Sequence, residues 1–343
     1  MRKKVIFLFC LNLIFTHVVC SQNTLRIMFY NVENLFDTEK SDKKDDGDFT
    51  PDGQLRWTPG RYYNKLNNLA KVITSVGEWN NPAIIGLCEV ENERCMTGLT
   101  KHSLLRAQDY RYVITNCADR RGINVALMYQ RDQFKYLAHQ SYQIKFPQNP
   151  RKVTRDILHV SGLIQTGDTL DVFVCHFPSR RGGEQESEPD RIRAASVLKS
   201  KTDSLTNVRK KINIVIMGDF NDEPTNLSLT RTLQAMPVEQ NIKPKALYNL
   251  FYKYVKQNNV GTYKYGRQWN VLDQIIVSGN LFDRKTKFHV LPETAIIFQR
   301  DFMMVKDPSN GGKKPFKTYT GMKHTGGYSD HLPVYVDFAV EKK

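Results

Sequence analysis

The chain has 343 residues, of which 40% are hydrophobic and 25% charged, and its formal net charge is +15 at pH 7. This length allows one large domain or two smaller ones, and the composition excludes a largely disordered chain. The positive charge favours anionic partners such as nucleic acid, phosphorylated small molecules or anionic lipid headgroups; charge that serves solubility alone is the alternative.

The first twenty residues have the pattern of a secretory signal peptide. Basic residues at 2–4 precede the apolar run VIFLFCLNLIF, and cleavage is expected just after Cys20. One alternative is an N-terminal membrane anchor, but the apolar run is short for that role. Another is cleavage before Cys20 with lipid attached to its thiol, but Val19 is larger than the residue that usually precedes a lipidated cysteine. We therefore expect an exported protein with a signal peptide at 1–20 and a single domain at 21–343. Removing residues 1–20 lowers the net charge to +12.

Four cysteines follow the predicted signal peptide: Cys88, Cys95, Cys117 and Cys175. They form no CxxC pair, which argues against a structural zinc site or a thioredoxin-like motif. Cys88 and Cys175 end apolar runs and are expected to be buried thiols. Export would permit a disulfide between Cys95 and Cys117, and the sequence leaves that pairing open.

Strand-like and helix-like segments then alternate along the chain without a linker or an internal repeat. Apolar runs predict strands at 25–31, 84–90, 110–115, 123–130, 156–164, 169–177, 212–217, 272–278 and 332–340. Helical periodicity or charge pattern predicts helices at 61–78, 96–107, 188–209 and 226–235. Residues 37–60 and 307–327 are expected to be surface loops; the first contains several aspartates but lacks the spacing of a calcium loop. The mixture of alternation and hairpin-like neighbours predicts a mixed α/β sheet.

Polar residues follow or begin the strongest predicted strands. They are Asn31, Glu33, Glu89, Glu91, His176, Asp219, Asn221, Asp273, Asp330 and His331. Ligands of α/β proteins bind where strand ends meet, so these side chains are expected to share one site. Carboxylate, amide and imidazole groups without cysteine suit Mg²⁺ or Mn²⁺. Such a cation would relieve the repulsion among crowded carboxylates and present a charge to a phosphate.

The segments FYNVEN, GLCEVEN, CHFPSR, MGDFND, WNVLDQIIV and YSDHLPV occur in the order found in the endonuclease/exonuclease/phosphatase superfamily. The chain resembles its deoxyribonuclease I, abasic-site endonuclease, neutral sphingomyelinase and inositol polyphosphate 5-phosphatase branches over residues 25–338. The resemblance implies an α/β four-layer sandwich, in which two packed mixed β-sheets are flanked by helices as in deoxyribonuclease I. It also implies a site at one end of the sandwich.

The resemblance also implies roles for individual residues. Glu89 and Asp330 correspond to metal-binding acids, and Asn31 to an asparagine that supports metal and phosphate. Asp219 and Asn221 correspond to the pair that orients the attacking water and the phosphate. His331 corresponds to the histidine near the phosphate and Asp273 to its partner.

Further correspondences concern His176, which ends its strand as in the nuclease and sphingomyelinase branches, and Glu33, an acid near the metal. Arg155 is a looser match to a phosphate-binding arginine, and neutralising Asp156 or another acid is its alternative. Glu91 is expected to lie behind the ligands or on the surface.

The implied function is Mg²⁺-dependent hydrolysis of phosphate esters by a monomer, with nucleic acid as the preferred substrate. Nucleic acid is favoured by the net charge of +12, by the PSRRGG segment after His176 and by the basic loop 307–327. A phosphatase or a sphingomyelinase-like lipid phosphodiesterase is the first alternative. A non-catalytic nucleic-acid-binding protein is the second, and it would not require the catalytic residues.

Overall fold

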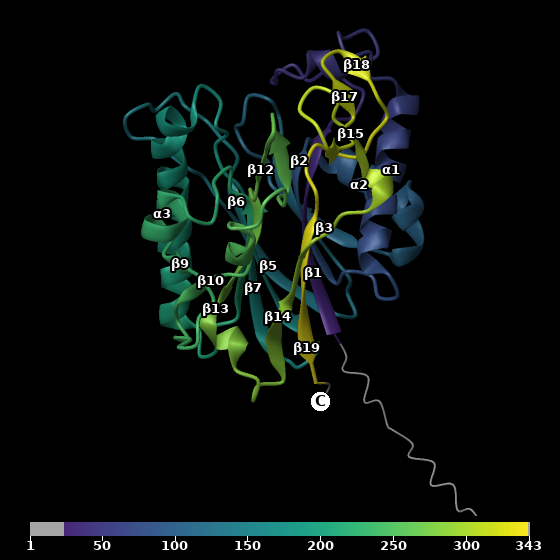
Figure 1. The fold of residues 1–343 in the computed structure, drawn as a ribbon. Helices are drawn as coiled ribbons and strands as arrows, with labels where there is room; N and C mark the ends of the chain where they lie inside the picture. The colour runs from purple at the N-terminus through teal and green to yellow at the C-terminus, as the bar shows by residue number, and fades with distance from the viewer. Residues whose placement is uncertain (1–23, 342–343) are drawn as a thin grey trace, which may run out of the picture.

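Two mixed β-sheets packed face to face form the centre of the protein (Figure 1). The computed structural model describes residues 24–341. The first sheet contains, in spatial order, β14 (Phe288–Ile297), β19 (Val334–Val340), β1 (Thr24–Leu35), β2 (Ile84–Val90), β4 (Asn124–Tyr129) and β3 (Arg111–Ile114). The second contains β5 (Phe134–Tyr142), β6 (Ile157–Ile164), β7 (Thr169–His176), β8 (Ile214–Asp219), β13 (Asp273–Ser278), β10 (Leu247–Asn249) and β9 (Ala235–Met236).

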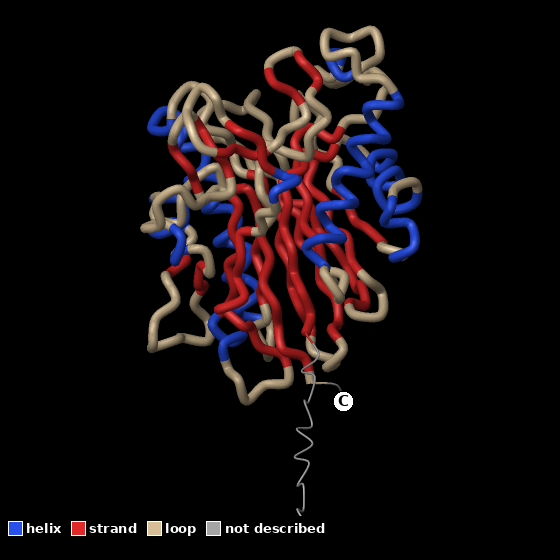
Figure 2. The backbone as a smooth tube through the Cα atoms, turned by 45° about the vertical axis from the view of Figure 1, so that its right-hand side comes forward, coloured by secondary structure: helices blue, strands red, loops and turns tan. Residues whose placement is uncertain are grey.

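Helices cover the outer faces of both sheets, which completes four layers (Figures 1 and 2). Helices α1 (Pro59–Gly77) and α2 (Glu93–Lys101) pack on the first sheet, and α3 (Glu184–Val208) packs on the second. The apolar face of α1 includes Leu66, Leu69 and Ile73, all fully buried. The predicted four-layer sandwich of two mixed sheets is thus confirmed.

Strand β8 is buried on both faces, which explains why its sequence does not alternate between apolar and polar residues. Val215 and Met217 face the core between the two sheets, whereas Ile214 and Ile216 face α3. Burial of an aliphatic side chain contributes about 1.5–3 kcal/mol to stability, so both faces of this strand favour the fold. The strand is therefore anchored from both sides where it ends at Asp219.

Strand directions bring the predicted polar ends to one edge, which lies at the top in Figure 1. Strands β7 and β8 are parallel, with His176 opposite Asp219. Strand β13 is antiparallel to β8, so its first residue, Asp273, also lies opposite Asp219. In the other sheet β1 and β2 are parallel, and β19 is antiparallel to β1 with Val334 opposite Phe29. The segment before β19 therefore reaches the ends of β1 and β2.

Three small β-hairpins lie at this edge. They are β11 (Tyr263–Tyr265) with β12 (Gln268–Asn270), β15 (Met304–Lys306) with β16 (Lys313–Pro315), and β17 (Tyr319–Thr320) with β18 (Lys323–His324). The predicted loop at 307–327 thus contains paired strands. The predicted loop at 37–60 contains a 3₁₀ turn, Gly47–Phe49, and the fully buried Trp57.

Other expectations need correction. The predicted helix at 96–107 ends at Lys101, and a separate 3₁₀ turn, Leu104–Gln108, follows because the Ser103 hydroxyl accepts from the Leu105 amide and starts a new turn. The predicted helix at 226–235 is a single π-helical turn, Ser228–Thr232.

The described cysteines are free, buried thiols, so Cys95 and Cys117 are not joined. The signal-peptide and Cys20 predictions lie outside the described residues. Within 24–341, no helix combines the length and apolar character needed to cross a membrane.

Candidate active site

A cavity of about 670 Å³ opens where the strand ends meet. Six of the predicted site residues line it: Glu89, His176, Asp219, Asn221, Asp330 and His331. Asn31 and Asp273 are buried behind this lining and contact it by hydrogen bonds. Eight residues between Asn31 and His331 therefore lie in or directly behind the lining of one cavity.

Asp219 lies at the centre of the arrangement. Its Oδ2 accepts from the Asn31 side-chain amide at 3.1 Å and lies 3.6 Å from His176 Nε2, and its Oδ1 accepts from the Asn221 backbone amide at 2.9 Å. Burial, with the negative charge of Asp273, raises the pKa of Asp219 to about 6, although His331 opposes the rise. A carboxylate with this pKa can accept a proton from water near neutral pH.

His331 and Asp273 form a buried charged pair. His331 Nδ1 lies 2.6 Å from Asp273 Oδ2, and its Nε2 faces Asp219 Oδ2 at 3.9 Å. Burial alone would lower the pKa of His331, but Asp273 and Asp219 outweigh it and raise that pKa well above its usual value. The ring of Tyr263 lies against the imidazole with centroids 4.8 Å apart. His331 is therefore an imidazolium held in a fixed orientation.

His176 has the opposite electrostatic character. Burial, aided by the positive charges of Arg155 and Arg121, lowers the pKa of His176 well below its usual value. Its Nε2 lies 3.6 Å from Asp219 and 4.0 Å from Glu89, and its Nδ1 is buried without a hydrogen-bond partner among residues 24–341. Two histidines with different charge states thus flank one carboxylate, a combination that can separate proton acceptance from charge stabilisation.

Glu89 and Asp330 are the residues suited to hold a divalent cation. Glu89 has a left-handed backbone, φ 62°, at a bulge in the pairing of β2 with β4. This conformation is rare for a residue with a side chain and is associated with active sites. Burial opposes ionisation of Glu89, but Arg121, His331 and the Asn34 amide together lower its pKa. Burial raises the pKa of Asp330; the charge of Glu89 adds to this effect, and His331 opposes it.

The donor set suits a divalent cation, as the resemblance described above implies. Two carboxylates lining one cavity offer hard oxygen atoms, which Mg²⁺ and Mn²⁺ prefer. The mutual repulsion between Glu89 and Asp330 is the kind of unfavourable interaction that a bound cation relieves. Asn31 contributes from behind: its Oδ1 accepts from the Glu33 amide at 3.0 Å while its amide group orients Asp219.

Asn221 is fixed by the loop that follows β7. Its side-chain amide donates to the Phe177 carbonyl at 3.0 Å, and its own carbonyl accepts from Arg180 Nε at 2.7 Å. Its backbone is left-handed, φ 50°, a conformation that asparagine tolerates better than most residues. The ends of β7 and β8 are therefore joined by side-chain contacts as well as by sheet hydrogen bonds.

Some predicted residues have other partners. Arg155 does not line the cavity: its guanidinium donates to the Phe177 carbonyl at 2.5 Å and pairs with Asp119 at 3.5 Å, so the acid that it neutralises is Asp119 and not Asp156. Glu33 is not among the residues that line the cavity; its Oε2 accepts from the Thr318 amide at 2.7 Å and lies 3.6 Å from Lys65 Nζ.

Glu91 is buried, is not among the residues that line the cavity, and accepts from the Asp37 amide at 2.7 Å.

The structure adds residues that sequence reasoning did not identify. Arg121 lies 3.3 Å from Glu89 and lines the cavity, as do Arg180, Arg181, Tyr263 and Asn34. Arg180 and Arg181 belong to the PSRRGG segment, whose charge predicts nucleic-acid contacts but does not by itself place either arginine in the cavity. No local pattern distinguishes Arg121 in CADRRG from other surface arginines, because its position depends on the β3–β4 connection.

The four-layer sandwich with acids and histidines at one edge defines a deoxyribonuclease I-like fold. The family model described as "Endonuclease/Exonuclease/phosphatase family" matches residues 26–340. The chain therefore belongs to this family, whose named activities are hydrolyses of phosphate esters.

Solved structures with this fold have low sequence identity to the chain. Humanized D. rerio TDP2 is 14% identical with a TM-score of 0.57, covering 92% of this chain and 99% of that one. The human nocturnin catalytic domain is 17% identical with a TM-score of 0.55, covering 93% and 95%. A mannosyl-6-phosphatase from Bacteroides thetaiotaomicron is 18% identical with a TM-score of 0.52, covering 92% and 99%. Comparison with curated protein sequences gave no significant match.

Proposed function

We propose that this protein is an exported, divalent-metal-dependent phosphodiesterase that cleaves nucleic acid. The observation that carries the proposal is the position of Asp219 between a neutral His176 and a cationic His331, in the same cavity as the Glu89 and Asp330 carboxylates. Phosphodiester hydrolysis requires a base for water, positive charge on the phosphate oxygens and help for the leaving oxygen.

In the proposed mechanism, Asp219 accepts the proton of the attacking water and Asn221 holds that water and the phosphate. The imidazolium of His331 stabilises the negative charge that develops on the phosphate oxygens. His176 donates a hydrogen bond from its neutral ring to a phosphate oxygen. A cation held by Glu89 and Asp330 supplies further positive charge to the phosphate when it is bound.

Nucleic acid is favoured by the charge of +12 on the chain without residues 1–20 and by the arginines that line the cavity, Arg121, Arg180 and Arg181. Polyanion binding through such residues depends steeply on salt. One feature favours a compact phosphomonoester instead: Glu184 lines the same cavity, and Glu186 and Glu188 follow it on α3. These carboxylates would repel an extended phosphate backbone, so phosphatase activity is the second candidate.

The test is to offer the purified chain duplex DNA, RNA, sphingomyelin, inositol phosphates and a sugar phosphate, each with Mg²⁺ and with a chelator. We expect metal-dependent cleavage of nucleic acid that is lost in Asp219→Ala. The matched control is Asp203→Ala, which removes an exposed carboxylate of α3 that pairs with Lys199. Cleavage of the sugar phosphate alone would select the phosphatase. Tight DNA binding without turnover would select a binding protein, and equal activity of wild type and Asp219→Ala would refute the assigned site.

Export, attachment and oligomeric state need separate measurements. Export predicts that cells release the protein without residues 1–20, which terminal sequencing of the purified product reports. Incorporation of labelled fatty acid, lost in Cys20→Ser, would instead identify a lipid anchor. The proposed monomer predicts a mass near that of one chain in light scattering.

A further inference from the structure

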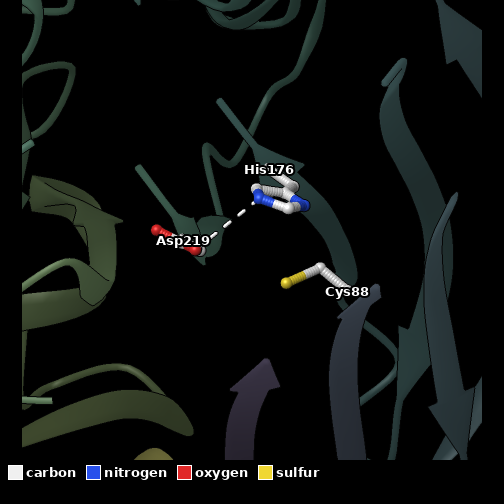
Figure 3. Close-up of side chains that lie close together, drawn as sticks. All are labelled: Cys88, His176 and Asp219. Carbon is white, nitrogen blue, oxygen red and sulfur yellow. Dashed lines mark ion pairs between the residues drawn. The ribbon is translucent and has the colours of Figure 1, made fainter. Parts of the chain in front are cut away.

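Cys88, His176 and Asp219 form a compact group beside the cavity (Figure 3). One ligand atom of each side chain, the thiol sulfur, an imidazole nitrogen and a carboxylate oxygen, lies within 4.8 Å of the others. Figure 3 shows the Cys88 sulfur directed toward Asp219, with the His176 ring above both. All three side chains are buried, and His176 and Asp219 also line the cavity, so a small ion can reach them from solvent.

This set of atoms has a chemistry different from that of Glu89 and Asp330. Mg²⁺ binds oxygen and does not select sulfur, whereas Zn²⁺ and Cd²⁺ favour thiolate and imidazole ligands. We propose that Cys88, His176 and Asp219 bind a thiophilic divalent cation such as Zn²⁺, with the proton of the Cys88 thiol released to water in the cavity, and that this binding inhibits the enzyme.

The geometry requires only a small adjustment. Zinc bonds of about 2.0–2.3 Å in a tetrahedral arrangement place neighbouring ligand atoms about 3.5 Å apart. Atoms now within 4.8 Å of each other therefore need to approach by at most about 1.3 Å. Water from the cavity or Glu89, whose Oε1 lies 4.0 Å from His176 Nε2, completes the fourth position.

Inhibition follows from the identity of the ligands, and this step rests on the proposed function. An Asp219 carboxylate bound to Zn²⁺ cannot accept a proton from water, and a His176 ring bound to the ion cannot bind a phosphate oxygen. Cys88 has no role in the proposed hydrolysis. The thiol therefore makes the site sensitive to thiophilic cations without being needed for turnover with Mg²⁺.

Binding is tested first, without reference to activity. The chain without residues 1–20, which lacks Cys10 and Cys20, is kept free of thiol reductants and titrated with Cd²⁺ while the ultraviolet charge-transfer absorption of a Cd²⁺–thiolate bond is recorded. We expect a saturable band in wild type and in Cys95→Ser, a matched removal of another buried thiol, and no such band in Cys88→Ser or Cys88→Ala. An unchanged band in both Cys88 variants, or none in wild type, overturns the proposal. The band requires no turnover, so its outcome is independent of whether the assigned activity is found.

Inhibition is tested next at a fixed Mg²⁺ concentration. Loss of a residue that merely supports a metal ligand costs about 10–100-fold in affinity, so loss of the thiol ligand should raise the Zn²⁺ concentration for half-inhibition by at least about tenfold. Cys88→Ser and Cys88→Ala are expected to retain Mg²⁺-dependent activity, whereas Cys95→Ser should be inhibited as wild type is. Equal inhibition of wild type and both Cys88 variants would mean that Zn²⁺ acts through Glu89 and Asp330, and it would overturn the inhibitory role of Cys88.

Discussion

Replacement of Asp273 by asparagine tests the role of the His331 charge. The substitution keeps the shape of the side chain but removes the carboxylate 2.6 Å from His331 Nδ1. Unit charges 4 Å apart interact by about 4 kcal/mol at an effective dielectric constant of about 20, and this pair is closer. Loss of one preorganised group that stabilises transition-state charge typically lowers kcat by about 10²–10³-fold. We expect a decrease of that size for Asp273→Asn at pH 8.

The pH profile of kcat/KM gives the sharper measurement. In wild type, activity should rise with pH through about 6 as Asp219 ionises, because the base must be unprotonated. Activity should then persist above neutrality, because His331 stays protonated until its raised pKa is reached. Asp273→Asn lowers that pKa, so the alkaline decline should move to lower pH and leave a narrow maximum. An alkaline limb at the same pH in variant and wild type would refute the assigned role of the pair. The double variant Asp273→Asn/His331→Asn should be little worse than His331→Asn alone.

Four further results are expected. Asp219→Asn should lower kcat by about 10²–10⁴-fold with little change in substrate binding, measured by steady-state kinetics and by DNA affinity at several salt concentrations. Chelation should abolish activity and Mg²⁺ or Mn²⁺ should restore it, while Glu89→Gln should need at least about tenfold more metal for half-activation in a metal titration. Arg180→Met should lower kcat up to about 100-fold through displacement of the loop after β8, with the fold unchanged by circular dichroism. Arg191→Met should lower the free energy of unfolding by about 3 kcal/mol in denaturant titrations, because it removes the guanidinium 2.6 Å from the fully buried Asp222 and leaves only the more distant Arg180, at 3.7 Å, to balance that carboxylate.

The central strands could be predicted because local sequence and tertiary environment agree there. The run before Asp219 is apolar at every position, and β8 is buried on both faces. The polar residue that ends each such strand could be anticipated for the same reason. The order of the motifs, together with the rule that ligands bind at strand ends, was enough to group Glu89, Asp219 and His331 at one cavity.

Edge elements could not be predicted because their patterns are weak. Strand β5 is largely exposed along its length, so its sequence FKYLAHQSY shows no consistent apolar face. Strand β14 contains Pro292, and its pairing with β19 shifts between Leu291 and Ile296, which interrupts any period of two. Both strands are defined by their partners in the sheet, which a single segment does not reveal.

The side-chain partners within the site also could not be predicted from local sequence. The sequence left Arg155 with two possible roles, contact with phosphate or neutralisation of a nearby acid, and in the structure it pairs with Asp119 and donates to the Phe177 carbonyl. Arg121 instead contacts Glu89, although nothing in the local sequence distinguishes Arg121 from Arg155 as a cavity residue. Which arginine reaches the cavity depends on how the β3–β4 connection folds over the end of β2.

The register between β8 and β13 has a consequence for how this protein can change. Asp219 and Asp273 occupy facing positions of one antiparallel ladder, so the spacing between the proposed base and the partner of His331 is set by main-chain hydrogen bonds. The segments that border the cavity, including residues 179–184 and the Tyr263–Asn270 hairpin, are attached to this ladder without determining its spacing. Substrate preference can therefore be altered by exchanging rim residues other than Arg180, which holds Asn221, while Asp219 and Asp273 keep their distance.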